Sequence, residues 1–283
     1  MVLIADGGST KCDWVALDDS GNTQFSTQTE GLNPAILQYD IILERLRKSE
    51  DLEEIRNKIA TVHFYGAGCG TDSPKKLLTD TLSAFFPKAQ VTVMEDTVAA
   101  VRSVTTEPGI VCILGTGSNS AYFDGRQIHP GPPSLGYLVM DEASGNYFGK
   151  KLLADYFYNK MPSAERRAFQ EKFDLSPDTI KQNLYKEAHP NAYLATFGSF
   201  VFSDTKSAYF WSLIRNGLDQ FIENRVLCFK ESKQLPVHFI GSMAHFSREL
   251  LKERLSAFNL KLGTVLQRPI DGLAEYHRRN INP

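Results

Sequence analysis

The chain has 283 residues, of which 42% are hydrophobic and 23% charged, and its net charge of −2 gives no basic footprint for nucleic acid. The four cysteines form no CxxC pair, which disfavours structural zinc and iron–sulfur clusters. The longest apolar run is too short to span a bilayer and Met1 leads directly into a strand pattern, so we expect a cytoplasmic protein without a membrane partner.

The first hundred residues predict alternating strands and helices. Strand patterns break at glycine-rich or Asp-Ser-Gly-Asn turns, and helical spacing of apolar residues follows them. The expected elements are strands at 2–5, 14–18 and 23–29, helical structure at 35–60, a strand at 61–65, a helix at 74–86, a strand at 90–94 and a helix at 96–104. This alternation favours an α/β domain.

The opening pattern of strands and turns returns near Ile110, in "GIVCILGTGSNSAYFDGRQIHPG". We therefore infer one fold unit used twice, and expect two domains at 1–108 and 109–283. After the second set of strands the expected elements are helices at 143–160, 163–189 and 205–232, a strand at 237–240, a helix at 246–258, a strand at 261–265 and a helix from 271. The last helix, about 271–283, can pack back on the first domain.

Two glycine-rich turns occupy equivalent places in the two halves: "DGGSTK" at 6–11 and "GTGSN" at 115–119. Glycine lets several backbone N–H groups converge in one concavity, which binds phosphate oxygens. A tight hairpin that needs positive φ is the simpler interpretation of either turn alone. Two such turns favour phosphate binding, and neither a GxxxxGK[ST] loop nor a complete dinucleotide fingerprint is present.

The order of these motifs resembles the actin-like ATPases, which include sugar kinases, acetate kinase and heat-shock ATPases. Within them it is most similar to the BadF/BadG family, which contains N-acetylglucosamine kinase, and the resemblance covers essentially the whole chain. It implies two actin-like, ribonuclease H-like α/β domains around a nucleotide cleft. The matching segments are "DGGST" at 6–10, "MEDTVAAV" at 94–101, "GTGSN" at 115–119, "VHFIGSMAHF" at 237–246 and "RPIDGLAEYH" at 268–277.

The resemblance implies that ATP and Mg²⁺ bind to these motifs. Asp6 would hold the metal, through water, and Asp96 would accept the proton of the attacking hydroxyl. A helix N-cap is the simpler role for Asp96, as an ordinary surface position is for Lys11. The nucleotide-binding residues would be Gly7, Gly8, Ser9, Thr10, Lys11, Gly115, Thr116, Gly117, Gly241 and Ser242.

A sugar would be contacted by residues from two further family segments. "GLNP" at 31–34 supplies an asparagine, although a turn before a helix also explains it. "SLGYLVMDEASG" at 134–145 keeps the family's Asp-Glu pair but carries Met140 and Ala143 where the family has glycine. The sugar-binding residues would be Asn33, Ser118, Asn119, Tyr137 and Asp141.

The sequence therefore predicts an ATP-dependent kinase of an amino sugar, with N-acetylglucosamine and its 6-phosphate as the first candidates. Two alternatives stay open: an ATPase that drives a conformational change in a partner, and a sugar- or nucleotide-binding regulator without turnover. A small-molecule sugar and ATP are the expected partners, and a homodimer through the second domain is compatible with the resemblance. No cysteine pair matches the iron–sulfur activator branch of the family.

Overall fold

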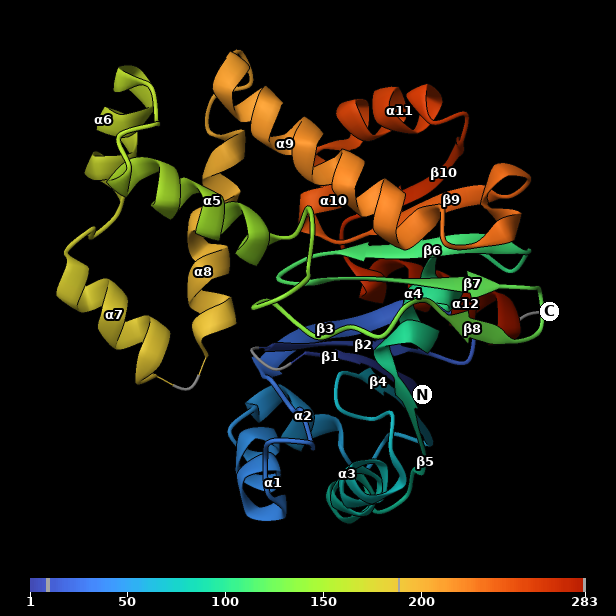
Figure 1. Ribbon diagram of the computed structural model, residues 1–283. Helices are drawn as coiled ribbons and strands as arrows, with labels where there is room; N and C mark the ends of the chain where they lie inside the picture. Colours follow the sequence, from blue (N-terminus) through green and yellow to red (C-terminus); the bar gives the residue numbers. More distant parts are fainter. Residues whose placement is uncertain (9–10, 188, 282–283) are drawn as a thin grey trace. The chain divides into compact units, whose positions relative to one another are not determined.

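The computed structural model describes residues 1–8, 11–187 and 189–281. Its contacts divide the chain into two compact units (Figure 1). Unit 1 consists of Met1–Ser103 and Arg268–Pro283, and unit 2 consists of Val104–Gln267. Each unit contains a five-stranded mixed sheet with helices packed against it. The α/β fold class predicted from the sequence is confirmed.

The sheet of unit 1 has the strand order β3-β2-β1-β4-β5. Its strands are β1 (Val2–Gly7), β2 (Lys11–Leu17), β3 (Thr23–Glu30), β4 (Thr61–Gly66) and β5 (Gln90–Glu95). The first three form an antiparallel meander, whereas β4 runs parallel to β1 and β5 parallel to β4. In this register Gly7 pairs with Gly66, and Gly66 pairs with Glu95. The carboxyl ends of β1, β4 and β5 therefore meet at one edge.

Side chains of β1 alternate between two buried clusters on the two faces of this sheet. Leu3 and Ala5 belong to the cluster that includes residues of the first three helices, whereas Ile4 belongs to the cluster with Tyr65 and Leu273. This is the period-two alternation of a strand that is covered on both faces. The helices are α1 (Tyr39–Arg47), α2 (Glu50–Ile55), α3 (Asp72–Phe85), α4 (Asp96–Val104) and α12 (Pro269–Ile281).

The sheet of unit 2 repeats this topology, with the strand order β10-β9-β6-β7-β8. Its strands are β6 (Gly109–Leu114), β7 (Ser118–Phe123), β8 (Ile128–Pro130), β9 (Pro236–Ile240) and β10 (Lys261–Leu266). Again three consecutive strands form an antiparallel meander, and two later strands extend the sheet in parallel from the first. The repeat inferred from the two glycine turns is thus present in the strand order.

Helices make up most of the remainder of unit 2, and one large apolar cluster joins them to the sheet. Aromatic rings dominate its outer part, where Phe169 packs against Phe173, Phe197 and Phe200. The helical elements are α5 (Gly145–Phe157), α6 (Ser163–Lys172), α7 (Pro177–Tyr185), α8 (Pro190–Gly198), a 3₁₀ turn (Ser199–Phe202), α9 (Ala208–Phe221), a π turn (Ile222–Val226), a 3₁₀ turn (Lys230–Lys233), α10 (Ser242–Phe246) and α11 (Arg248–Ala257).

Several predicted helices are divided where a polar residue caps a new one. The side chain of Ser49 accepts a hydrogen bond from the Leu52 N–H and starts α2, so 35–60 is not one helix. Ser176 does the same for α7, with Pro177 at the first helical position. The helix expected from 246 begins instead at Ser242 and restarts as α11, and α8 was not predicted. Among the described residues, no helix is long and apolar enough to cross a membrane.

Candidate functional site

Carboxylates gather at the edge of the unit 1 sheet where β1 ends. Asp6 pairs with Asp13 across β1 and β2, and Asp96 opens α4 directly after β5. Burial, followed by the negative charges of Asp13 and Asp96, raises the pKa of Asp6 to about 7, against opposing effects of Lys11 and Arg268. A cation near Asp6 would relieve this repulsion.

Asp13 differs from Asp6 because it has its own hydrogen-bond donors. Lys11 Nζ lies 2.9 Å from one carboxylate oxygen, and Gln28 Nε2 donates to the other at 2.8 Å. Although burial acts in the opposite direction, these bonds lower the pKa of Asp13. Lys11, which the motif assigns to the nucleotide, is therefore paired with Asp13 in this structure.

The predicted phosphate-1 turn is closed by a hydrogen bond from the Gly8 N–H to the Lys11 carbonyl at 2.8 Å. Gly7 has no room for a side chain, because a Cβ there would lie 2.2 Å from the ring of Phe64. Ser9 and Thr10 lie outside the described residues.

A glycine-rich loop at 66–70, after β4, connects two further predicted site residues of unit 1. Asn33 Oδ1 accepts a hydrogen bond from the Ala35 N–H at 2.9 Å and lies against Gly68, where a Cβ would be only 2.0 Å from it. Gly68 has φ +80°, so glycine is required on both grounds. At Gly70 a Cβ would lie 3.0 Å from Glu95 Oε2. The loop thus contacts Asn33 at one point and the residue before Asp96 at another.

Asp96 is the first residue of α4. Removal of water from its carboxylate, followed by the charge of Glu95, raises the pKa of Asp96, whereas a bond from the Thr97 N–H opposes this. A carboxylate whose pKa is raised holds a proton more readily than an ordinary aspartate does, which suits a general base.

In unit 2 the glycine turn at 115–117 is fixed to the start of α5. The N–H of Gly145 donates to the Gly115 carbonyl at 2.8 Å, and that of Asn146 donates to the Thr116 carbonyl at 3.0 Å. The carbonyls of Gly115 and Thr116 therefore already accept hydrogen bonds. The N–H groups of Thr116 and Gly117 have no acceptor among the described residues. A Cβ on Gly115 would meet nothing within 4 Å. The turn therefore has two backbone donors free to bind an anion, as an anion-binding concavity does.

Asp141 contacts this turn at Gly117 and Ser118. Its side chain is 6% exposed, and one carboxylate oxygen accepts from the Ser118 N–H at 3.2 Å while the other accepts from Asn146 Nδ2 at 2.9 Å. A Cβ on Gly117 would lie 2.9 Å from Asp141 Oδ2. The structure thus places this predicted sugar-binding residue against the phosphate-2 turn.

The other predicted sugar-binding residues of unit 2 have mixed environments. Ser118 is buried and its hydroxyl has no partner among the described residues. Asn119 Oδ1 accepts from the Ser120 N–H at 2.9 Å. The ring of Tyr137 packs against the core of unit 2, and its carbonyl accepts from Lys150 Nζ.

The predicted adenosine motif lies directly against the same turn. Gly241 has φ +116°, and a Cβ there would be 2.2 Å from the Leu114 carbonyl and 3.1 Å from the Gly115 N. Only glycine permits this approach. Gly241 is followed at once by Ser242 and α10, which ends at Phe246.

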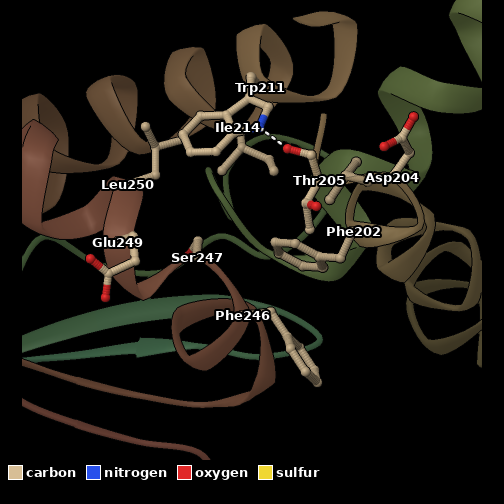
Figure 2. A pocket seen from close by; sticks show the side chains of 10 residues that line it. Phe202, Asp204, Thr205, Trp211, Ile214, Phe246, Ser247, Glu249 and Leu250 are labelled. Carbon is tan, nitrogen blue, oxygen red and sulfur yellow. Dashed lines mark hydrogen bonds between the residues drawn. The ribbon is translucent and has the colours of Figure 1, made fainter. Parts of the chain in front are cut away.

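A cavity of about 190 Å³ opens at the far end of α10 (Figure 2). Trp211 Nε1 donates to the Thr205 carbonyl at 2.6 Å, and Figure 2 shows the indole above the ring of Phe202. The lining is mostly apolar, with two carboxylates, and consists of Val201, Phe202, Asp204, Thr205, Trp211, Ile214, Phe246, Ser247, Glu249 and Leu250. Sequence reasoning missed these residues, although an aromatic five positions after Gly241 was an available signal.

Comparison with known proteins agrees with this picture. A structure from Porphyromonas gingivalis, a proposed N-acetylglucosamine kinase, is 37% identical over 99% of both chains with a TM-score of 0.92. A proposed N-acetylglucosamine kinase from Chromobacterium violaceum is 15% identical, with a TM-score of 0.72 and coverage of 97% and 98%. A ROK family glucokinase from Streptomyces griseus is 12% identical, with a TM-score of 0.59 and 97% coverage of each chain. No family model and no curated protein matches the chain.

The chain has two sheets of the same topology, and in each a glycine-rich turn joins the first two strands. This is the two-domain actin-like ATPase fold. Among proteins of this fold, the chain belongs to the same family of sugar-kinase-like proteins as the Porphyromonas protein. The narrower BadF/BadG assignment rests on the sequence motifs alone.

Proposed function

We propose that the protein is an ATP-dependent sugar kinase that phosphorylates an amino sugar, with N-acetylglucosamine as acceptor and its 6-phosphate as product. One set of observations carries the proposal: in unit 2 a turn has free N–H groups, Gly241 packs against that turn, and a cavity lies at the far end of α10, the helix that follows Gly241. We assign these three places to the phosphates, the ribose and the base of a nucleotide. The family relative proposed to be an N-acetylglucosamine kinase supports the acceptor class.

In addition to the phosphate-1 residues predicted in unit 1 (Gly7, Gly8, Ser9, Thr10 and Lys11), three features of unit 2 would hold the nucleotide. The N–H groups of Thr116 and Gly117 would donate to phosphate oxygens, and Gly241 with Ser242 would contact the ribose. The base would enter the cavity between Trp211 and Phe246. The Streptomyces glucokinase of the same fold was crystallised with glucose and AMPPNP, which supports ATP as the donor.

Magnesium would be held at the edge of the unit 1 sheet by Asp6. Mg²⁺ is commonly bound by one or two carboxylates, with water and phosphate oxygens completing the shell. The raised pKa of Asp6 shows a carboxylate that a cation would stabilise. When bound, Mg²⁺ supplies neutralisation of the charge on the phosphates.

The acceptor would be oriented by Asn33 and activated by Asp96. Asn33 is fixed by the Ala35 N–H and by Gly68, so its amide has a defined direction. Asp96 would take the proton of the attacking hydroxyl, and its raised pKa favours that proton's transfer. Phosphoryl transfer needs mainly this positioning together with charge neutralisation.

A coupled assay over a panel of hexoses and amino sugars tests the proposal, with Asp96→Asn as the decisive variant. Loss of a general base lowers kcat by about 10²–10⁴-fold. Asparagine caps helices about as well as aspartate, so the melting temperature should not change. The nucleotide KM should also stay constant, because Asp96 is assigned to the acceptor.

The matched control is Asp178→Asn, which removes another carboxylate from the first turn of a helix, α7. It should leave kcat unchanged. Turnover that no sugar stimulates, or an Asp96→Asn enzyme with wild-type kcat, would exclude the proposed kinase mechanism.

A further inference from the structure

The loop at 131–142 follows β8 and leads to α5 (Figure 1), and three of its apolar side chains are exposed. Leu135 is 63% exposed, Leu138 77% and Val139 70%. The loop is held by the ring of Tyr137, which packs against the core of unit 2, and by polar contacts to its backbone and its ends.

Arg225 supplies two of these contacts. It is 2% exposed, and its guanidinium donates to the Pro132 carbonyl and to Met140 Sδ, the latter at 3.1 Å. Burying a cation without a charged partner is costly, and both of these acceptors of Arg225 are uncharged. One buried side chain thus ties the beginning of the loop to its end. Met140 therefore lies against Arg225.

Asn224 supplies a third contact beside it. Its Nδ2 donates to Glu142 Oε1 at 3.1 Å, while the second oxygen of Glu142 is buried without a partner among the described residues. Asn224 and Arg225 both belong to the π turn Ile222–Val226, marked by the bond from the Leu227 N–H to the Ile222 carbonyl at 2.9 Å. Such turns are rare and often occur at functional sites.

The end of the loop is connected to the glycine turn at 115–117 through Asp141. Glu142 follows Asp141, and the Asp141 carboxylate accepts from the Ser118 N–H and lies against Gly117. Asp141 has φ +74° and Ala143 φ +59°, a conformation that non-glycine residues adopt only when their surroundings impose it. The Asp141 carboxylate is thus held by its own bonds to Ser118 and Asn146, and the contacts of Met140 and Glu142 hold the backbone on both sides of it.

We propose that the π turn is a clamp, in which Asn224 and Arg225 are positioning residues that hold Asp141 and thereby the phosphate-binding turn at 115–117. The clamp acts on nucleotide binding through Asp141, and this role rests on the function proposed above. It predicts that disturbing the 224–142 contact loosens the loop and the turn together.

Asn224→Asp tests the clamp with a minimal change of shape. Asn224 is exposed, so folding should be retained, but two carboxylates would then face each other across the former hydrogen bond. We expect the nucleotide KM to rise about tenfold, because a like-charge pair at this separation repels strongly.

Two further variants separate the clamp from a general effect of added charge. Glu142→Gln combined with Asn224→Asp recreates a hydrogen bond across the contact and should restore the nucleotide KM. Asn216→Asp places the same charge on an exposed position of α9 and should have no effect. An unchanged nucleotide KM in Asn224→Asp, or a defect that the double variant retains, would overturn the proposal.

Hydrogen exchange measured by mass spectrometry tests the clamp without any turnover. Amides of 115–118 and 131–142 should exchange faster in Asn224→Asp and return to the wild-type rate in the double variant. Unchanged exchange at 115–118 would overturn the clamp even in an active kinase. Faster exchange there in a protein that binds no nucleotide would instead contradict the proposed function while supporting the clamp.

Discussion

At the scale of single residues, neighbouring aspartates differ in pKa because their surroundings differ. Asp13 is paired with Lys11 and Gln28, whereas Asp6 is partly buried near two other carboxylates. Burial and these charges raise the pKa of Asp6 to about 7, whereas the pKa of Asp13 is lowered. A motif read from the sequence shows that both aspartates exist, but not which of them keeps a compensating partner.

Gly115→Val separates ligand binding from folding at the glycine turn. A Cβ at Gly115 meets no atom within 4 Å, so the melting temperature should not change. The nucleotide affinity should fall at least tenfold, because a side chain added to the turn would crowd a phosphate bound to its backbone N–H groups. Titration calorimetry with a non-hydrolysable ATP analogue measures this.

Gly117→Val is the informative comparison, since a Cβ there would lie 2.9 Å from Asp141 Oδ2. This variant should lose stability as well as affinity. A Gly115→Val protein that binds the nucleotide normally would mean that the turn is only a tight connection between strands.

The sequence predicted some site residues and not others for a physical reason. Glycine turns are recognisable because backbone approach excludes side chains, as at Gly241 against Leu114. Residues such as Phe202 and Trp211 could not be assigned to the cavity, because an apolar residue has the same signature in a pocket as in a core. The roles of Asn33 and Asp96 stay predictions.

At the scale of elements, α12 is joined to unit 1 by a buried polar contact. His277 Nε2 lies 2.9 Å from the Tyr65 hydroxyl, which also accepts from Arg102 at 2.9 Å, and His277 stacks on His63 with centroids 4.3 Å apart. Gly272 permits close packing, since a Cβ there would be 2.1 Å from the Ser103 carbonyl. The sequence predicted the helix and its glycine, but not this arrangement, which depends on residues more than two hundred positions apart.

The contact makes stability depend on pH. Burial, followed by the charges of His63 and Arg102, lowers the pKa of His277 to about 3, from the ordinary value of 6.5. Folding therefore favours neutral His277, and its contribution is fully present above pH 6.5 and is lost progressively as the pH falls from 6.5 towards 3. Urea unfolding at several pH values should show this loss.

His277→Gln should flatten the same pH dependence, because glutamine does not titrate there while it retains a polar group near Tyr65. His129→Gln is the control, since His129 is about half exposed and belongs to unit 2. A variant at position 277 with the full wild-type slope would assign the pH dependence to other groups.

At the scale of the whole molecule, the repeated strand order was predictable although the two halves share little sequence identity. Strand order follows from apolar patterning and turn chemistry. In the meanders at 2–30 and 109–130, apolar strands and turns follow one another in the same order. The helices inserted in unit 2 follow no repeat. The helix boundaries in this unit depend on single capping residues such as Ser176. Apolar spacing that continues across such a residue gives no sign that one helix ends and another begins.

Stabilisation of the protein by a nucleotide, measured together with turnover, separates a sugar kinase from a partner-driving ATPase and from a binding regulator. A ligand that binds only the folded state adds RT ln(1+[L]/Kd), or about 2.7 kcal/mol at a hundred times Kd. We expect an ATP analogue to raise the melting temperature, and Phe246→Ala to reduce this rise. Phe246 is 58% exposed, so the variant should melt normally without nucleotide.

Tyr185→Ala, which removes an aromatic that is 81% exposed in α7, should leave the nucleotide-dependent rise intact. If Phe246→Ala keeps the full rise, the cavity beyond α10 does not hold the base. A rise in the wild type without turnover would favour a binding regulator, and turnover that no sugar stimulates would favour a partner-driving ATPase. A rise accompanied by sugar-dependent turnover is the outcome expected of the kinase, because only there must the nucleotide and an acceptor act together.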